Sequence, residues 1–416
     1  MTYPLAPEVT ETADVLGAKA HGLIVLRRLG LPVPPGFVIG TPACQEFLRE
    51  GRLPDLTAAV RELALSTGDR TVSVRSGGRV SMPGMMNTIL DVPLTVSRLT
   101  PAVEAVFSSW HTPRARTYRE LHDIPHDLGT AVTVQAMVFG GRGGSGVAFS
   151  RDPNTGEHVP FGEVLFGHRG DAVVSGRTVT RPLRELADRA PAIWAELLAA
   201  MECIEEHYRD ACSVEFTFES GRLWLLQVRA GGFVGAAAAR VAVELADAGV
   251  ISPSEAVRRV PAHVDTARID AAGADVFTRG LGACPGVATG RVATTADAAV
   301  RMDGPAILVR PHTSPLDMHG LAAAAGVVTS TGGPASHAAI VARSMGKPAV
   351  VAATGLTVEE SRVRAGDRTL PAGTLVTIDG TSGEVVLGSP RVITGESDPH
   401  ARRLREWALL GLGQRQ

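Results

Sequence analysis

The chain of 416 residues is long enough for two or three domains, each with a buried core. Hydrophobic residues make up 44% and charged residues 20%, as in soluble globular enzymes, and the net charge of −2 excludes a general attraction to nucleic acid or anionic membranes. No apolar run is long enough to span a bilayer, and the start lacks a signal-peptide pattern. The four cysteines lack metal-ligand spacing, which indicates reduced packing residues. We therefore expect a cytoplasmic protein with no nucleic-acid or membrane partner.

The N-terminal part mixes helical and strand patterns and contains two basic residues suited to phosphate. Residues 17–29 have helical periodicity, and Lys19 lies in the first turn of this helix, after a glycine. Arg75 ends the strand-like run 72–75 before a glycine turn, where a guanidinium can bind phosphate with two hydrogen bonds. Each residue also has a simpler interpretation, because a helix lysine is usually solvated and an arginine at a strand end often forms a surface ion pair.

The next part predicts β-structure around a glycine-rich loop, followed by a long helix. Strand-like runs at 131–138 and 146–149 flank the loop 140–146. The backbone N–H groups of this loop can surround phosphates, but its spacing matches no P-loop, so a mobile hairpin loop is an equal alternative. Residues 183–207 predict the helix.

A β-hairpin is predicted over residues 213–228. Alternation places Ser213 and Glu215 on one face of its first strand, and Gln227 and Arg229 on one face of the second. Oxygen ligands from such a glutamate and glutamine suit Mg²⁺, and the arginine suits the phosphate tail of a nucleotide. An isolated glutamate on a strand is otherwise usually solvated.

The C-terminal part predicts a helical connector, a linker and a compact β-rich domain. Residues 235–260 are typical of two helices, and the polar stretch 261–275 is the best linker candidate. The β-rich domain begins at about residue 280. Within it, Ser314 is placed to cap a short helix, and a capping role is sufficient for Thr313 and Ser314.

His337 lies in the most informative segment of the chain. Two glycines form a turn, Ser336 occupies the position of a helix N-cap, and residues 338–345 predict a short helix that stops at Gly346. The imidazole is thus carried at the positive end of a helix dipole, where free N–H groups can hold a phosphoryl group. A lone histidine would more often only help to cap a buried helix, but here the glycines, the cap and the helix stop occur together.

This segment resembles the phosphohistidine signature of pyruvate phosphate dikinase and other phosphoenolpyruvate-utilising enzymes. Further stretches are similar to the ATP-grasp half of pyruvate phosphate dikinase, namely 16–41, 72–77, 81–88, 131–154, 214–217 and 226–229. The resemblance covers residues from about 12 to 388. It implies an α/β (α+β) fold, in which an ATP-grasp domain is followed by a swivelling β/β/α phosphohistidine domain. The implied divisions are an ATP-grasp domain at 1–234, a helical connector and linker at 235–275, the phosphohistidine domain at 276–390 and a tail at 391–416.

The resemblance also implies a function and the residues that perform it. ATP, with Mg²⁺, would phosphorylate His337, and the phosphoryl group would then pass to an acceptor bound elsewhere. The methionine-rich element at 82–86 is similar to that of the dikinase that consumes orthophosphate, which implies AMP and pyrophosphate as products. The implied nucleotide- and phosphate-binding residues are Lys19, Arg75, Glu163, Glu215, Gln227 and Arg229. Among them, Glu215 and Gln227 would also hold the metal, and Glu163 would serve the adenosine or metal site.

The sequence departs from the family pattern at several places. The large barrel that binds pyruvate or phosphoenolpyruvate in the family is absent, so the expected acceptor is a separate barrel-type protein or a small molecule. Ser213 stands where the family has an aspartate, which should weaken metal binding, and the region 91–130 is short. Ala335 replaces the regulatory threonine of some dikinases. A degenerate nucleotide-binding or regulatory protein therefore remains the alternative to an active phosphotransferase.

Overall fold

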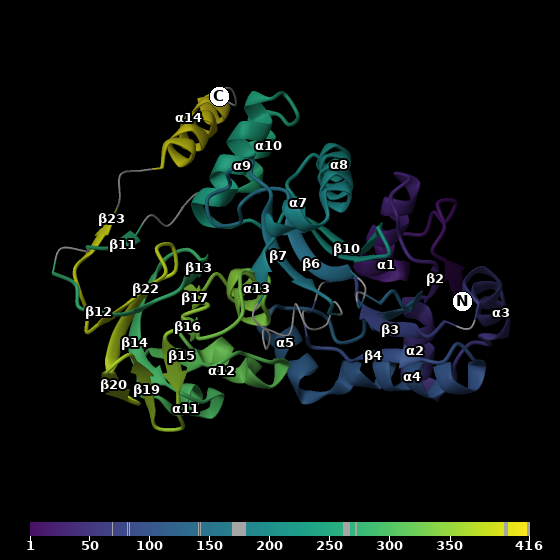
Figure 1. Ribbon diagram of the computed structural model, residues 1–416, viewed down its shortest axis with the longest axis horizontal. Coiled ribbons are helices and arrows are strands. Elements are labelled where there is room, and N and C mark those ends of the chain that lie inside the picture. Colours follow the sequence, from purple (N-terminus) through teal and green to yellow (C-terminus); the bar gives the residue numbers. More distant parts are fainter. Residues whose placement is uncertain are drawn as a thin grey trace. The chain divides into compact units, whose positions relative to one another are not determined.

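The computed structural model describes residues 1–68, 70–80, 82, 84–139, 141, 143–168, 180–260, 267–270, 273–394 and 398–413. The chain forms two compact units (Figure 1). Unit 1 contains Met1–Ser145, Phe166–Arg169 and Val214–Arg229, and unit 2 contains Gly146–Leu165, Gly170–Ser213 and Ala230–Gln416. Some residues of the predicted motifs lie outside the described residues, namely Ser81, Pro83, Gly140, Arg142 and, in the predicted linker, residues 261–266 and 271–272.

Unit 1 contains a five-stranded antiparallel sheet. Its strand order is β1 (Thr2–Pro4), β2 (Gly36–Ile39), β5 (Ala131–Ala136), β3 (Val72–Gly77) and β4 (Thr88–Val92). The apolar residues of β2, β3 and β5 form one core with three helices, α2 (Thr41–Glu50), α3 (Thr57–Thr67) and α4 (Val96–Ser108). A fourth helix, α5 (Pro113–Leu121), follows. The predicted strands at 72–75 and 131–138 are thus confirmed.

Helix α1 (Ala13–Arg28) approaches the end of β3 closely. The helix begins four residues before the predicted start and breaks its regular geometry at Gly17, where φ is +73°. A side chain at Gly17 would place its Cβ 1.7 Å from the carbonyl oxygen of Gly77, so only glycine allows this approach. Lys19 follows the break, and a Cβ on Gly77 would lie 3.2 Å from the Cβ of Lys19.

A second sheet of five strands has the order β10-β9-β6-β7-β8. Its strands are β6 (Gly143–Phe149), β7 (Phe161–Phe166), β8 (Arg181–Pro182), β9 (Cys212–Glu219) and β10 (Arg222–Ala230). The predicted hairpin is confirmed, and its turn residues Ser220 and Gly221 both have positive φ, as a two-residue hairpin requires. Residues 143–146 of the predicted glycine-rich loop belong to β6, where a Cβ on Gly143 would lie 2.0 Å from the Phe218 carbonyl oxygen.

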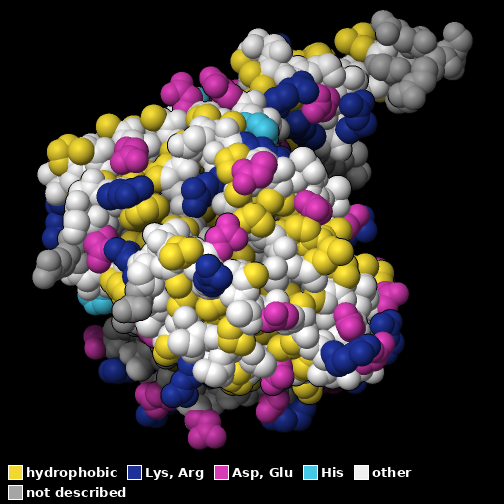
Figure 2. Space-filling view, turned by 90° about the vertical axis from the view of Figure 1, so that its right-hand side faces the viewer, with side chains coloured by type: hydrophobic (Ala, Val, Ile, Leu, Met, Phe, Trp, Pro, Cys, Tyr) yellow, Lys and Arg dark blue, Asp and Glu magenta, His cyan; other side chains and the backbone are white. Residues whose placement is uncertain are grey.

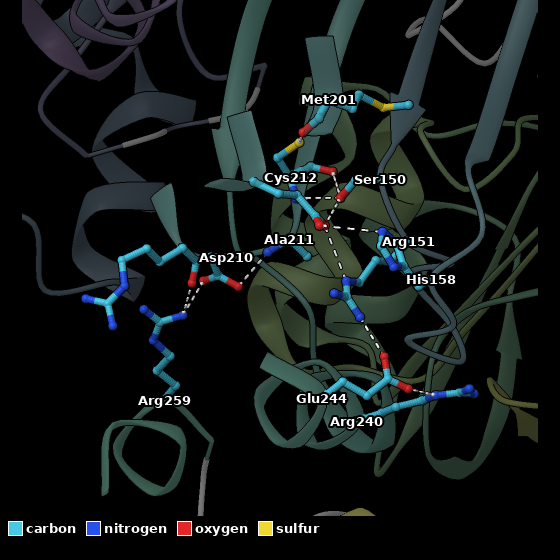
Figure 3. A network of polar contacts seen from close by, with 12 residues as sticks. Ser150, Arg151, His158, Met201, Asp210, Ala211, Cys212, Arg240, Glu244 and Arg259 are labelled. Carbon is cyan, nitrogen blue, oxygen red and sulfur yellow. Dashed lines mark hydrogen bonds and ion pairs between the residues drawn. The ribbon is translucent and has the colours of Figure 1, made fainter. Parts of the chain in front are cut away.

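A buried arginine of unit 2 joins the end of β6 to two helices (Figure 3). The single helix predicted over 183–207 is divided into α7 (Glu185–Arg189) and α8 (Pro191–Tyr208), because Pro191 begins a new helix. Arg151, only 4% exposed, pairs with Glu205 of α8 at 3.3 Å and with Glu244 of α9 (Gly235–Asp247) at 2.6 Å. Two carboxylates thus neutralise a buried cation that would be costly alone.

The helical connector continues from α9 into α10 (Pro253–Arg259), and both pack against α14 (Pro399–Gly413). The predicted N-cap of α10 is present, because the Ser252 hydroxyl accepts a hydrogen bond from the Glu255 N–H at 3.1 Å.

Among the helices in the described ranges, none is long and apolar enough to cross a membrane. Basic and acidic side chains are interspersed on the face drawn in Figure 2, in keeping with the small net charge.

The β-rich part of unit 2 is an eight-stranded sheet with the order β12-β22-β21-β14-β15-β16-β17-β13. Its strands are β12 (Val276–Arg279), β13 (Leu281–Cys284), β14 (Val287–Ala293), β15 (Ala306–Arg310), β16 (Gly326–Thr329), β17 (Ala349–Val351), β21 (Leu375–Asp379) and β22 (Glu384–Leu387). The four central strands β14 to β17 are parallel. They are connected through α11 (Ala296–Arg301), α12 (Met318–Ala323) and α13 (His337–Met345).

Two smaller sheets accompany this domain. Strands β18 (Leu356–Val358), β19 (Arg362–Ala365) and β20 (Arg368–Pro371) form an antiparallel sheet that shares its core. Strand β11 (Ala267–Ile269), within the predicted linker, pairs with β23 (Val392–Thr394). The strands predicted at 286–294, 306–309, 326–329, 349–352 and 374–378 are all present, within one or two residues at their ends.

Candidate functional site

Arg75 joins the central sheet of unit 1 to the β9–β10 hairpin. It lies on β3, two residues before the end of the strand, and one guanidinium nitrogen, Nη2, binds Oε2 of Glu215 at 3.2 Å. The other, Nη1, donates to the carbonyl oxygen of Leu226 at 3.2 Å. The side chains of Arg75 and Glu215 are 13% and 27% exposed, so the pair is partly shielded from water yet reachable by a ligand.

Lys19 belongs to the same cluster, and its charge is sensitive to the neighbouring cations. Burial is the main cause that lowers the pKa of Lys19 to about 7, and the positive charge of Arg75 lowers it further. Glu215 opposes the shift and Arg229 adds to it. A lysine with this pKa is ready to accept a proton when an anion arrives.

The buried amide of Gln227 orients Arg229. In the amide orientation that satisfies both groups, the Gln227 oxygen accepts from Nε of Arg229 at 2.8 Å and from Nη2 at 3.0 Å. Both residues lie on β10, two positions apart, as the alternation predicted. Gln227 is 6% exposed, and its packing therefore fixes the guanidinium that it holds.

This cluster carries more positive than negative charge. It brings the cations Lys19, Arg75 and Arg229 close to the single carboxylate of Glu215. Such an arrangement suits a polyphosphate, whose negative charge exceeds that of one carboxylate.

The cluster fits Mg²⁺ only in part. The described residues include no group of three or more His, Cys, Asp or Glu side chains that could hold a metal ion. Glu215 offers one carboxylate, and Mg²⁺ commonly combines one or two carboxylates with substrate phosphates. Ser213 precedes Glu215 on the same face of β9 and offers only a hydroxyl. The oxygen of Gln227 could reach a metal only by giving up its hydrogen bonds to Arg229.

The low pKa of Lys19 leads to a calorimetric prediction. At pH 8 the free amine is mostly neutral, and a bound phosphate should raise its pKa, so ATP binding should take up roughly one proton. At pH 6 the amine is already protonated and the uptake should vanish. Titration in buffers with different ionisation enthalpies measures this number. Lys19→Arg should bind ATP without uptake at pH 8, and equal uptake in both proteins would show that Lys19 does not meet the phosphates.

His337 lies at the carboxyl ends of two neighbouring parallel strands of unit 2. The loop that follows β16 carries His337 at the start of α13, and the loop that follows β15 carries Thr313. The two loops are held together by the N–H groups of Ser330 and Thr331, which donate to carbonyl oxygens of Arg310 and Pro311. Ligands commonly bind at this edge of a parallel sheet.

One ring nitrogen of His337 lies within hydrogen-bonding distance of a side chain, and the other has no hydrogen-bond partner among the described residues. Nδ1 lies 3.1 Å from the hydroxyl oxygen of Thr313. Nε2 is buried and has no hydrogen-bond partner among the described residues. Burial is the main cause that lowers the pKa of His337 to about 4, while the negative charge of Asp317 opposes the shift. The ring is therefore neutral at physiological pH, which is the form that can act as a nucleophile.

Glu163 lies beside the turn that precedes His337. Its Oε1 accepts from the Thr180 hydroxyl at 2.7 Å, and its Oε2 accepts from the Ala335 N–H at 3.4 Å. A Cβ on Gly333 would lie 1.5 Å from Oε1, so this turn needs glycine. Burial raises the pKa of Glu163 above its usual range.

Arg343 of α13 secures the same turn. Its guanidinium donates to the carbonyl oxygen of Pro334 at 2.6 Å and to that of Ala283 at 3.0 Å. It also lies over the ring of Phe149, whose β6 side chain packs against Ala335. The turn before His337 is thus contacted by Arg343 of α13 and by Phe149 of β6.

The structure groups the predicted site residues into two sets. Unit 1 brings five of them together, Lys19, Arg75, Glu215, Gln227 and Arg229. Unit 2 contains Glu163 and His337, which lie on either side of one turn.

Sequence reasoning missed Thr313, to which it assigned only a capping role. The cap is made by Ser314 alone, in a capping box with Asp317. A signal for Thr313 was nevertheless present. Thr313 follows the predicted strand at 306–309, and His337 follows the next predicted strand, at 326–329.

Two known protein families match separate parts of this chain. Residues 53–183 match the family described as pyruvate phosphate dikinase, AMP/ATP-binding domain, and residues 302–383 match the mobile domain of the PEP-utilising enzymes. Pyruvate, phosphate dikinase of Rhizobium meliloti is 36% identical over 96% of the chain, and dikinase 2 of Zea mays is 33% identical over 92%. The chain belongs to the pyruvate phosphate dikinase family. Membership, predicted from the motifs, is confirmed, as is a mixed α/β fold with a nucleotide-binding and a mobile domain.

The similarity to full-length dikinases is partial. The chain spans 58% of the Rhizobium meliloti dikinase and 57% of the Zea mays dikinase. Among solved structures, D-alanyl-alanine synthetase A of Vibrio cholerae is similar to 53% of the chain and 56% of its own length. The TM-score is 0.33 at 14% identity, which is too low to support a conclusion.

Proposed function

We propose that this protein is an ATP-dependent phosphotransferase that phosphorylates His337 and passes the phosphoryl group to an acceptor. The observation that carries the proposal is the imidazole of His337, which is neutral, hydrogen-bonded at Nδ1 and unpartnered at Nε2. Membership in the dikinase family supports ATP as the phosphoryl donor.

The nucleotide would bind to the cluster of Lys19, Arg75 and Arg229. These cations would neutralise the polyphosphate and the charge that develops during transfer. Glu215 would hold Mg²⁺ together with phosphate oxygens, and Gln227 would join it only by exchanging its bonds to Arg229. Mg²⁺ would supply charge neutralisation of the phosphate oxygens. The role of Glu163 at the adenosine or metal site stays a prediction.

The chemical step starts from the lone pair of Nε2. This nitrogen forms a bond to the β-phosphorus of ATP, and the bond from that phosphorus to the oxygen of the departing AMP breaks, so that Nε2 carries a pyrophosphoryl group. Orthophosphate or water then attacks the terminal phosphorus of this group, and the bond from that phosphorus to the bridging oxygen breaks, which leaves one phosphoryl group on Nε2. The proton on Nδ1 stays on the ring, where the Thr313 hydroxyl oxygen accepts it in a hydrogen bond. With orthophosphate as co-substrate, ATP, orthophosphate and His337 give AMP, pyrophosphate and phosphohistidine. With water instead, the products are AMP, orthophosphate and phosphohistidine.

The acceptor would receive the group at a second place, so His337 must visit two sites. A swing of the domain at 276–390 about the predicted linker 261–275 would achieve this, as the matching description of a mobile domain supports. A barrel-type protein and a small molecule are the two acceptor classes.

The experiment that tests this function uses ATP labelled at the β-phosphate, with Mg²⁺ and with or without orthophosphate. We expect acid-labile, base-stable label on the protein and release of AMP. Release of pyrophosphate only when orthophosphate is supplied would identify orthophosphate as the co-substrate. Binding of ATP without any label on the protein would instead assign the chain to the degenerate nucleotide-binding class.

A further inference from the structure

Ser336 occupies the N-cap position of α13 but does not cap the helix. Its side chain makes no hydrogen bond to the backbone of the first turn, although its own N–H donates to the Gly333 carbonyl at 3.0 Å. The hydroxyl is buried, with only 4% of the residue exposed, and has no partner among the described residues. The hydroxyl of a serine at an N-cap normally accepts a hydrogen bond from a backbone N–H group of the first helical turn, and the Ser336 hydroxyl does not.

An unsatisfied buried hydroxyl destabilises a protein unless a ligand completes it. Ser336 directly precedes His337, whose Nε2 is also buried and unpartnered. The helix that begins here has nine residues and carries no acidic side chain in its first turn. Its second and third residues are Ala338 and Ala339, so no side chain there competes for the N–H groups of that turn. Hydroxyl, imidazole and helix N-terminus together form a position suited to an anion.

We propose that the Ser336 hydroxyl donates a hydrogen bond to a phosphoryl oxygen on Nε2 of His337, and so stabilises the phosphorylated state. The proposal rests on the proposed function, because it needs His337 to carry the phosphoryl group. Thr313 would hold Nδ1 and Ser336 would hold the phosphoryl group, one on each side of the ring.

The test measures the equilibrium between phosphorylated and unphosphorylated protein at fixed concentrations of ATP, orthophosphate, AMP and pyrophosphate. Ser336→Ala should lower the phosphorylated-to-unphosphorylated ratio by ~10-fold or more, the scale of one hydrogen bond to a charged group. Ser336→Cys keeps the connectivity of the side chain but replaces the hydroxyl with a larger thiol that is a much weaker donor, and should lower the ratio similarly. The matched control is Ser344→Ala on the same helix, whose hydroxyl donates to the Val341 carbonyl, and its ratio should equal that of the wild type.

A second measurement separates phosphoryl binding from a structural role. Because the hydroxyl has no partner in the unphosphorylated protein, Ser336→Ala should melt at the same or a higher temperature in that state. After phosphorylation the order should reverse, with the wild type melting higher. A lower melting temperature of the unphosphorylated variant would assign Ser336 a structural role and overturn the proposal.

The outcomes also separate this inference from the function on which it rests. If wild-type protein is labelled on His337 and both Ser336 variants keep the wild-type ratio, only the inference is wrong. If the wild-type protein is never labelled, the inference and the proposed function fall together.

Discussion

His337→Ala should abolish the label that ATP leaves on the protein. Nε2 of His337 is the proposed nucleophile, and alanine has no atom that can take its place. The loss should therefore be complete within detection, which is the largest effect that we expect of any substitution. The measurement is acid-labile label after incubation with β-labelled ATP, Mg²⁺ and orthophosphate.

Two controls make this result specific. His319→Ala removes an exposed histidine of the same domain, which is bound to Asp297 at 2.8 Å, and its label should equal that of the wild type. ATP binding by His337→Ala should remain nearly unchanged, because the nucleotide cluster belongs to unit 1 and His337 to unit 2. Label that persists in His337→Ala would show that another residue is the nucleophile.

Arg75→Ala and Arg229→Ala should each lower the rate of His337 phosphorylation by ~10²-fold or more. Each substitution removes a cation that would stabilise the charge of the transferring phosphoryl group, and losses of this size follow removal of one such contact. Quenched-flow measurement of label formation gives the rate. In Arg229→Ala, the Gln227 side-chain oxygen would also lose both of the hydrogen bonds that it accepts from Arg229.

The matched control for these variants lies on the same strand. Arg222 of β10 is exposed and lies over the Trp224 ring at 4.0 Å, away from the cluster, so Arg222→Ala should keep the wild-type rate. Loss of the ion pair of Arg75 and Glu215 leaves a carboxylate whose side chain is 27% exposed, so water can solvate it. Both variants should therefore fold, and a wild-type rate in either one would remove that arginine from the site.

Local pattern was sufficient for the secondary structure around both candidate sites. Alternation along the β9–β10 hairpin predicted that Glu215 faces one way on its strand and that Gln227 and Arg229 share a face, and the burial pattern agrees. The capping box that begins with Ser314 was likewise readable, because a cap depends on residues three positions apart. The helix at 183–207 was predicted as one segment and is two, since Pro191 starts a new helix there.

Contacts between distant segments could not be predicted in this way. Arg75 meets Glu215 across 140 positions of sequence, and the family resemblance implied only that both serve one nucleotide. Glu163 contacts the N–H of Ala335 across 172 positions, although the resemblance assigned it to the adenosine or metal site. Both contacts depend on how sheets and loops pack, which periodicity does not encode.

The sequence by itself determined that a histidine begins a helix after a glycine turn, because turn and helix signals act over a few residues. Only the tertiary structure decided the state of that histidine. Thr313 reaches Nδ1 because β15 and β16 are parallel neighbours, so the loops after them meet at one edge of the sheet. Ser336 has the residue type and position of a cap, yet the fold leaves its hydroxyl buried and unpartnered, one residue before His337. A hydrogen bond requires a donor–acceptor distance of about 3 Å and a nearly linear angle at the hydrogen, and packing rather than residue type sets both.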